Sequence, residues 1–265
     1  MRSVLVVGGS DSGGGAGLSA DLKTLSALGV HGSSVVTAVT AQSSTAVLGV
    51  WPVPVAAVRA QLAAVLDDLG ADVVKTGMLV GPEVVDAVVG AMADAVGDRP
   101  LVVDPVGSST TGQVLLSPDG LLALRDRLLP RATVITPNLA EVQALTGFVV
   151  RSRSDLREAA DRVLALGPTW VLVTGGHLPG EPVDLLADGT TYDELGGSRL
   201  DSPHTHGTGC TLASALAGHL ALGVTVPEAA RLARELVREA IAGGYGLGAG
   251  AGPVDPAARW RPGRA

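Results

Sequence analysis

The feature that most constrains this chain is a repeated alternation of short apolar runs with longer segments of helical periodicity. The short runs are rich in Val, Leu and Ile and predict strands, whereas apolar residues that recur every three or four positions predict helices. The predicted strands are residues 4–7, 34–39, 72–75, 101–104, 133–136 and 170–174. The predicted helices are residues 17–28, 55–69, 82–96, 118–128, 139–145, 155–166, 208–222 and 227–242. This order predicts an α/β fold: a mostly parallel central sheet with helices on both faces.

Glycines support these boundaries, because a helix often ends in a left-handed residue, for which glycine is favoured. The glycines directly after predicted helices are Gly29, Gly70, Gly97, Gly147, Gly167 and Gly223. Residues 183–200 have instead the pattern of a β-hairpin, with Asp188-Gly189 at its turn. We find no linker, repeat or second core, so we expect residues 1–265 to form a single domain. The tail GLGAGAGPVDP, residues 246–256, is expected to be flexible from its composition.

Composition narrows the class of function. The chain has 265 residues, of which 46% are hydrophobic, so it can bury a sizeable core. A net charge of −7 and only six aromatic residues argue against a nucleic-acid surface. The single cysteine excludes an intrachain disulfide framework. The N-terminal apolar run is interpreted as a strand rather than a signal peptide, and no run is long enough to span a membrane. We therefore expect a cytoplasmic protein.

The polar, glycine-rich segments follow the predicted strands. In parallel α/β sheets, ligands bind beyond the carboxyl ends of the strands. The segments TAQSS, KTGM, DPVGSSTTG, TPNLAE and TGGH all occupy such positions, as does the loop after the first strand. This arrangement predicts one large site at one edge of the sheet.

The loop after the first strand, GGSDSGGGAGLSAD at residues 8–21, fits the spacing of a dinucleotide-binding turn. A dinucleotide site also needs an acidic residue at the end of the second strand, and that strand has none. A P-loop needs Gly-Lys-Ser/Thr, which this loop lacks. A tight turn without a ligand is the alternative, but Asp21 one turn into the helix would suit a hydroxyl or ring nitrogen and disfavour phosphate. The loop is therefore interpreted as a holder of a small uncharged polar molecule.

An anion site is predicted at the other end of the chain, in HTHGTGC at residues 204–210. Gly207 and Gly209 flank Thr208 at the start of a helix, where free backbone N–H groups and the helix dipole attract anions. Cys210 lies in the first helical turn, where its thiolate would be favoured; a small buried hydrophobic residue is the alternative. We interpret the two histidines as hydrogen-bonding loop residues rather than metal ligands.

Two acidic positions complete the predicted site. Asp104 ends a buried strand, and Asn138 and Glu141 lie three residues apart at a predicted helix start. A capping box explains Asn138 and Glu141 without any ligand. A carboxylate close to an anion site is also what a Mg²⁺–phosphate complex requires.

Taken together, these stretches resemble, almost end to end, the hydroxymethylpyrimidine/phosphomethylpyrimidine kinases of thiamine biosynthesis, in the ribokinase-like superfamily. The matching stretches are GGSDSGGGAGLSADLKTLSALGVHG, VTAQSS, VKTGML, VVDPV, TPNLAE, GGH, THGTGC and GAGPV. The resemblance implies a three-layer αβα sandwich that uses ATP and Mg²⁺. Its implied reactions are phosphorylation of 4-amino-5-hydroxymethyl-2-methylpyrimidine and then of the monophosphate to the diphosphate. It also suggests a homodimer.

The resemblance further implies a role for each matching residue. The loop that contains Gly207, Thr208 and Gly209 would bind the transferring phosphoryl group, with Cys210 in the place of the base of sugar kinases. The implied pyrimidine pocket consists of Gly9, Asp21, Gln42, Met78 and Val106. The implied ATP-binding residues are Asn138, Thr174 and Gly176, and the implied metal ligands are Asp104 and Glu141.

The chain departs from the family pattern at three positions. Thr174 and Ala249 stand where the family commonly has lysines, which removes two cations near the expected phosphates, and Gly107 replaces a common methionine. Two alternatives stay open. One is a pyridoxal or pyridoxine kinase, because related enzymes of the same fold accept that similarly sized ring. The other, which the missing lysines suggest, is a catalytically weak protein that senses the pyrimidine.

Overall fold

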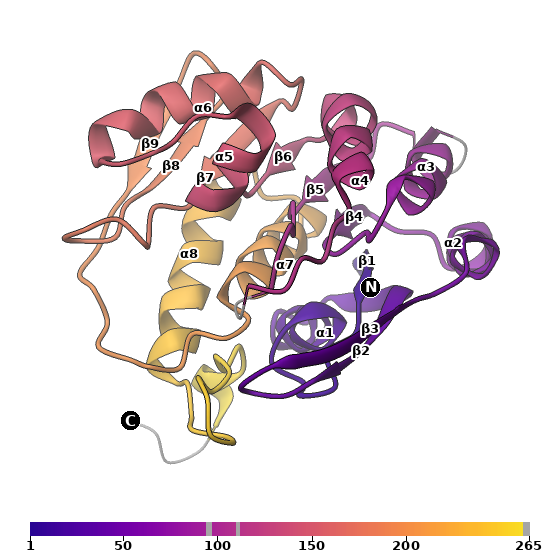
Figure 1. Cartoon of the computed structure of the whole chain (residues 1–265), viewed down its shortest axis with the longest axis horizontal. Helices are drawn as coiled ribbons and strands as arrows, with labels where there is room; N and C mark the ends of the chain where they lie inside the picture. The colour runs from indigo at the N-terminus through magenta and orange to yellow at the C-terminus, as the bar shows by residue number, and fades with distance from the viewer. Residues whose placement is uncertain (94–96, 110–111, 262–265) are drawn as a thin grey trace.

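A computed structural model describes residues 1–93, 97–109 and 112–261. Within them, strands form one sheet in the order β3-β2-β1-β4-β5-β6-β7-β8-β9 (Figure 1). The strands are β1 (Ser3–Gly9), β2 (His31–Gln42), β3 (Val47–Pro52), β4 (Val73–Thr76), β5 (Leu101–Val103), β6 (Val134–Ile135), β7 (Trp170–Val173), β8 (Asp184–Ala187) and β9 (Tyr192–Leu195). The pairs from β2 through β1 and β4 to β7 are parallel, whereas β3, β8 and β9 pair antiparallel. The mostly parallel sheet and the hairpin at Asp188-Gly189 are confirmed.

Helices cover both faces of the sheet (Figure 1), which confirms the three-layer αβα architecture. The helices are α1 (Gly17–Ala27), α2 (Val55–Asp68), α3 (Pro82–Ala91), α4 (Pro118–Ala123), α5 (Leu139–Thr146), α6 (Leu156–Leu164), α7 (Thr208–Ala221) and α8 (Val226–Ala242). One buried cluster lies under α2 to α6 and the other under α1, α7 and α8. Strand alternation divides β1 between them: Leu5 and Val7 join the first, Val4 and Val6 the second.

The predicted helix ends are largely correct. All six glycines expected after helices have positive φ, between +61° at Gly97 and +107° at Gly167. The last three residues of the helix predicted at 82–96 lie outside the described residues. None of the helices that the structure describes is both long and apolar enough to cross a membrane.

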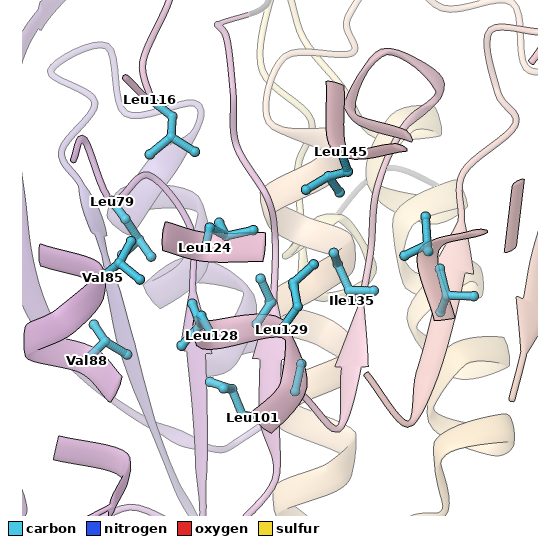
Figure 2. Close-up of a cluster of buried hydrophobic side chains, with 14 of the residues drawn as sticks. Leu79, Val85, Val88, Leu101, Leu116, Leu124, Leu128, Leu129, Ile135 and Leu145 are labelled. Carbon is cyan, nitrogen blue, oxygen red and sulfur yellow. The ribbon is translucent and has the colours of Figure 1, made fainter. Parts of the chain in front are cut away.

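The segment predicted as one helix at residues 118–128 changes its winding. It is α-helical to Ala123 and then widens into a π-helical turn, Leu124–Leu128, followed by a 3-10 turn, Leu129–Arg131. Leu124, Leu128 and Leu129 are all buried there, beside Leu101 and Ile135 of the sheet (Figure 2). The wider turn accompanies the entry of all three leucines into the core.

The sequence missed one strand and underestimated another. The predicted strand 34–39 extends in the structure from His31 to Gln42, and β3 pairs with its second half, from Ala38↔Pro52 to Gln42↔Val47. Gly49, Pro52 and Pro54 interrupt the apolar pattern of this stretch, so it does not have the signature of a strand. The antiparallel β2–β3 pair places Gln42 at the end of β2, beside the loop that follows β1.

The glycine-rich tail is packed rather than free, which corrects the expectation of flexibility. The Gly250 N–H donates to Ser44 Oγ at 3.1 Å, and the Gly252 N–H donates to His204 Nδ1 at 3.2 Å. His206 and Pro253 form a parallel bridge. A Cβ at Gly250 would lie 2.0 Å from the Ser44 carbonyl oxygen, so glycine is required for this approach. Distant partners, which the local sequence does not reveal, hold the tail in place.

This packing predicts that Gly250→Ala releases the tail. The added methyl group collides with backbone at Ser44, whereas Gly246→Ala meets only His204, at an ordinary 3.6 Å. Elastase cleaves after small residues. Each variant introduces one new alanine, so the two differ only in the position of that alanine. We expect several-fold faster cleavage within residues 246–252 for Gly250→Ala and little change for Gly246→Ala. Equal cleavage rates for the two variants would contradict the packing described here.

Candidate active site

The loop between β1 and α1 is organised by the side chain of Asp11. Its carboxylate accepts backbone hydrogen bonds from Gly13 at 2.8 Å, Gly15 at 3.0 Å and Ala16 at 2.7 Å. It also lies 3.1 Å from His206 Nε2. Burial opposes ionisation of this carboxyl, but the hydrogen bonds from His206 and the loop amides outweigh burial and lower its pKa. The ionised carboxylate therefore fixes the loop in one conformation.

The predicted anion loop packs directly on this first loop. Gly207 adopts φ +86°, and a Cβ there would lie 1.9 Å from the Gly15 carbonyl oxygen, so only glycine permits the contact. The N–H of Thr208 donates to the Thr205 carbonyl at 3.3 Å, so this amide, expected to be free, already has a weak partner. The N–H groups of Gly209 and Cys210 have no backbone partner in the described part of the chain and lie at the start of α7. These amides can donate hydrogen bonds to an anion.

Beneath the two loops lies a buried lysine whose position the sequence did not explain. Lys75, in the centre of β4, is 1% exposed. Its Nζ donates to Asp21 Oδ1 at 2.9 Å and lies 3.8 Å from Asp104 Oδ2. Ser214 Oγ of α7 donates to the same Asp21 oxygen at 2.7 Å. Burial disfavours the charged ammonium, but Asp21 and then the other neighbouring acidic groups outweigh burial and raise the Lys75 pKa.

This geometry shows what Asp21 binds within the protein. The carboxylate is 1% exposed and binds Lys75 and Ser214 in the interior. It is therefore a counter-ion to Lys75 beneath the loop, a role that the sequence did not predict; contact with a substrate stays a prediction. A strand lysine and a helix aspartate 54 positions apart carry no local sign that they pair.

Cys210 also differs from expectation. Burial raises the pKa of its thiol to about 12; Lys75 counteracts this only in part, because the carboxylates of Asp104 and Asp21 add to the rise. Asp104 and the backbone amide of Gly17 are both neighbours that influence the ionisation of this part of the site. The expected thiolate is therefore wrong for the free protein: the protonated thiol prevails, since burial and acidic neighbours outweigh the helix N-terminus.

Asp104 and Glu141 form the second acidic part of the site. Burial raises the pKa of Asp104 to about 6, with Lys75 as the principal opposing influence. Burial, followed by the negative charge of Asp104, raises the pKa of Glu141 to about 8. Asp104 Oδ2 is buried without a hydrogen-bond partner. Two buried carboxyl groups, of which Asp104 raises the pKa of Glu141 and keeps one oxygen without a hydrogen bond, form an environment that fits a divalent cation.

A cation here would need ligands from elsewhere as well. Within the described residues, no group of three or more His, Cys, Asp and Glu side chains converges as a ready-made metal site. Glu141 also completes the predicted capping box, since it accepts from the Asn138 N–H at 2.8 Å while Asn138 accepts from the Glu141 N–H at 3.0 Å. Phosphate oxygens and water would have to supply the other ligands.

The residues predicted to form the pyrimidine pocket lie close to the acidic pair and the two loops. Met78 lies against Gly9, where a Cβ would come within 2.7 Å of the Met78 Sδ. The Val106 N–H donates to the Asp104 carbonyl at 2.9 Å, which connects this part of the predicted pocket to the acidic pair. Gln42 lies across from His206, with 3.4 Å between the two Nε2 atoms. The structure therefore brings these residues to the same end of the sheet, above Lys75.

The residues predicted to bind ATP lie beyond β6 and β7. Asn138 and Thr174 are joined by a parallel bridge, and the Thr174 N–H donates to the Pro137 carbonyl at 2.9 Å. A Cβ at Gly176 would meet no atom within 4 Å, so its surroundings are open. The Arg199 guanidinium bonds the carbonyl oxygens of Gly176 at 3.0 Å, Leu178 at 2.8 Å and Gly180 at 2.9 Å. This arginine places a cation at the Gly176 carbonyl, two residues after Thr174, which stands where the family commonly has a lysine.

Sequence reasoning missed Asp11, Lys75 and Arg199. A lysine inside the otherwise apolar run VVKT was a usable signal, because lysine is almost never fully buried unless it is paired. Asp11 precedes a run of glycines whose amides it could bond, a weaker signal of the same kind. Arg199 lies in a segment without any pattern, so only the fold reveals it. The expectation that His204 and His206 are hydrogen-bonding loop residues is confirmed.

The buried ion pair predicts a large loss of stability in Lys75→Met. Methionine keeps the length of the side chain, but Asp21 and Asp104 then lose their cation in the interior. We expect the free energy of unfolding to fall by about 3–5 kcal/mol, as for other buried pairs that lose one partner. Arg2→Ala is the matched control, because it breaks the solvent-exposed Arg2–Asp72 pair and should change stability far less. Urea titrations that give the same small change for both variants would contradict a stabilising role for the buried pair.

The raised pKa of Cys210 predicts slow alkylation. With a pKa of about 12, only about one thiol in ten thousand is ionised at pH 8. Because the thiolate is the reacting species, the rate with iodoacetamide should rise with pH up to pH 10 without levelling off. Cys210 is the only cysteine, so mass spectrometry follows this one site, with a short cysteine peptide as the control. A plateau below pH 9 in the folded protein would show that the thiolate is favoured after all.

Residues 11–255 match the family model described as "Phosphomethylpyrimidine kinase". A hydroxymethylpyrimidine/phosphomethylpyrimidine kinase of Streptomyces coelicolor is 58% identical over 252 residues, which cover 95% of this chain and 93% of the relative. The enzyme of that name from Bacillus subtilis is 41% identical over 257 residues, which cover 96% of this chain and 94% of the relative.

Solved structures agree with this fold. A pyridoxal kinase of Bacillus subtilis, solved as an ADP complex, superposes with a TM-score of 0.91 at 37% identity, covering 98% of this chain and 99% of that one. A phosphomethylpyrimidine kinase of Clostridium difficile superposes with a TM-score of 0.81 at 38% identity, covering 91% and 100%.

Proposed function

Because this chain belongs to the phosphomethylpyrimidine kinase family, we propose that it phosphorylates 4-amino-5-hydroxymethyl-2-methylpyrimidine and then its monophosphate, in thiamine biosynthesis. It is a phosphotransferase, and ATP is the phosphoryl donor. The observation that carries this proposal is the 58% identity over 95% of the chain to a kinase of that name. The contact between the loop after β1 and the anion loop supports it, because the proposed ring site and the proposed phosphate site then adjoin.

The ring side of the proposed site has little charge. Gly9, Gln42, Met78 and Val106 form it, with Asp21 beneath. Met78 is 7% exposed and supplies an apolar surface against Gly9. Gln42 supplies the amide that hydrogen-bonds to the ring. An apolar pocket with one placed amide favours an uncharged heteroaromatic ring over a phosphate.

The phosphate side has the charge that phosphoryl transfer needs. Gly207, Thr208 and Gly209 hold the phosphoryl group with backbone N–H groups and the helix dipole. Asp104 and Glu141 would hold Mg²⁺, which neutralises the phosphate charge when it is bound. Asn138, Thr174 and Gly176 contact the nucleotide, with Arg199 as the nearby cation.

Cys210 is the proposed acceptor of the hydroxyl proton, but it starts as a thiol. With a pKa of about 12, it could take that proton only if the charges of the bound substrates lowered the pKa of the thiol. The hydroxyl proton would then move as the new phosphorus–oxygen bond forms. A modest contribution of this base to the rate suits phosphoryl transfer, which depends mainly on positioning and charge neutralisation.

A pyridoxal kinase is the second candidate. The TM-score of 0.91 with the Bacillus subtilis pyridoxal kinase favours it, and the two rings are similar in size.

The homodimer and the cytoplasmic location expected from the sequence stay predictions. The exposed Val39, Leu48 and Trp51 of the β2–β3 pair are apolar side chains that an interface would cover.

Release of ADP tests the proposed function. The protein is supplied with Mg-ATP and either the pyrimidine, pyridoxal or no acceptor, and ADP is measured with a coupled assay. We expect turnover with the pyrimidine, with a kcat/KM above that for pyridoxal, and a background rate without acceptor. A higher kcat/KM for pyridoxal would favour the second candidate. Binding of the pyrimidine without ADP release would instead indicate a sensor.

A further inference from the structure

We propose that His206, held by Asp11, orients the amide of Gln42 so that its NH₂ group points to the ring. His206 is then a positioning residue that determines which hydrogen bond the pocket offers. The inference deepens the proposed function and rests on it. It concerns three side chains from three parts of the chain: the loop after β1, the end of β2 and the anion loop.

The Asp11 carboxylate fixes the proton on His206. Asp11 and His206 side chains are only 2% and 15% exposed, and Asp11 Oδ2 lies 3.1 Å from His206 Nε2. An ionised carboxylate can only accept a hydrogen bond, so the proton of the imidazole has to be on Nε2. This holds whether the ring is neutral or charged.

The position of that proton determines the orientation of Gln42. The amide nitrogen Nε2 of Gln42 lies 3.4 Å from His206 Nε2. Two N–H donors cannot bond to each other, whereas a half-turn of the amide places Oε1 there as an acceptor. The single Nε2–H is then shared between Asp11 Oδ2 and Gln42 Oε1 as a three-centre hydrogen bond. The hydrogen-bond network therefore selects the orientation in which Oε1 faces His206 and the NH₂ group faces away from it.

Both partners are held in place. The Gln42 backbone N–H donates to Ser12 Oγ at 2.8 Å, and Ser12 Oγ donates to the Gln42 carbonyl at 2.8 Å. The His206 N–H donates to the Gly252 carbonyl at 3.2 Å, and the Val254 N–H donates to the His206 carbonyl at 3.1 Å. The tail thus fixes the backbone of the residue that orients the amide.

A fixed NH₂ group selects for the chemistry of the ring. It donates, so it favours a ring that presents an unprotonated nitrogen or an oxygen as an acceptor. A pocket built around one fixed donor discriminates against rings that cannot accept that hydrogen bond. The 4-amino-pyrimidine of the proposed substrate has such ring nitrogens.

A double-mutant cycle between His206 and Gln42 tests the proposal. Calorimetry measures the Kd of the pyrimidine for the wild type, His206→Leu, Gln42→Leu and the double variant, and the assay measures KM for ATP. We expect each single substitution to weaken pyrimidine binding roughly tenfold, as when a buried hydrogen bond is lost. His206→Leu should add little when Gln42 is already leucine, because the two act as a unit. The KM for ATP should stay within about threefold in every variant, which a general collapse of the site would not allow.

The conservative variants separate positioning from a structural role. In His206→Gln, the side-chain NH₂ can replace the Nε2–H donor, so the Kd should recover to within about threefold of wild type. In His206→Asn the side chain is too short, so the loss should match that of His206→Leu. If circular dichroism shows that His206→Leu does not fold, the comparison of His206→Gln with His206→Asn still tests the proposal.

Two results would overturn the inference. Additive losses in the cycle would mean that His206 and Gln42 act independently. Equal binding by His206→Gln and His206→Asn would mean that no donor at this position matters. If wild-type protein neither binds nor phosphorylates the pyrimidine, the proposed function itself fails, and the inference fails with it.

Discussion

The rest of this structure depends on one buried cation. Lys75 is placed in the middle of the sheet, where an unpaired ammonium would be prohibitively costly. Asp21 of α1 neutralises it at 2.9 Å, and Ser214 of α7 completes the coordination of that carboxylate. The pair thereby joins β4 to the two helices that begin at the two loops of the site. Asp104 Oδ2, 3.8 Å from the ammonium, has no hydrogen-bond partner at the base of the same site.

Above the Lys75–Asp21 ion pair, the backbones of two glycine-rich loops are in contact. Gly207 approaches the Gly15 carbonyl so closely that no side chain fits between them. The first loop is shaped by Asp11, and the second is bordered by the tail through the His206–Pro253 bridge. The proposed ring site and the proposed phosphate site therefore adjoin, although the two loops lie about 200 positions apart in the chain.

The sequence predicted most of the fold and only part of the site, for physical reasons. Strand–helix alternation and glycine caps are local, so the sheet, the helix ends and the hairpin at Asp188-Gly189 were predicted well. The strand β3 was missed because Gly49 and Pro52 obscure its pattern. The flexible tail and the Cys210 thiolate were wrong, and the ion pair of Asp21 was missed, for a shared reason. Each depends on burial or on a partner distant in sequence, and neither property can be derived from neighbouring residues.

The most direct test of the proposed site is a crystal structure with the hydroxymethylpyrimidine and Mg-ADP bound. We expect the ring between Met78 and the Gln42 amide, with its hydroxyl facing Cys210. We also expect the nucleotide phosphates toward residues 207–210 and the metal on Asp104 and Glu141. A pyrimidine bound away from Gln42, or nucleotide phosphates in the loop shaped by Asp11, would contradict the site described here.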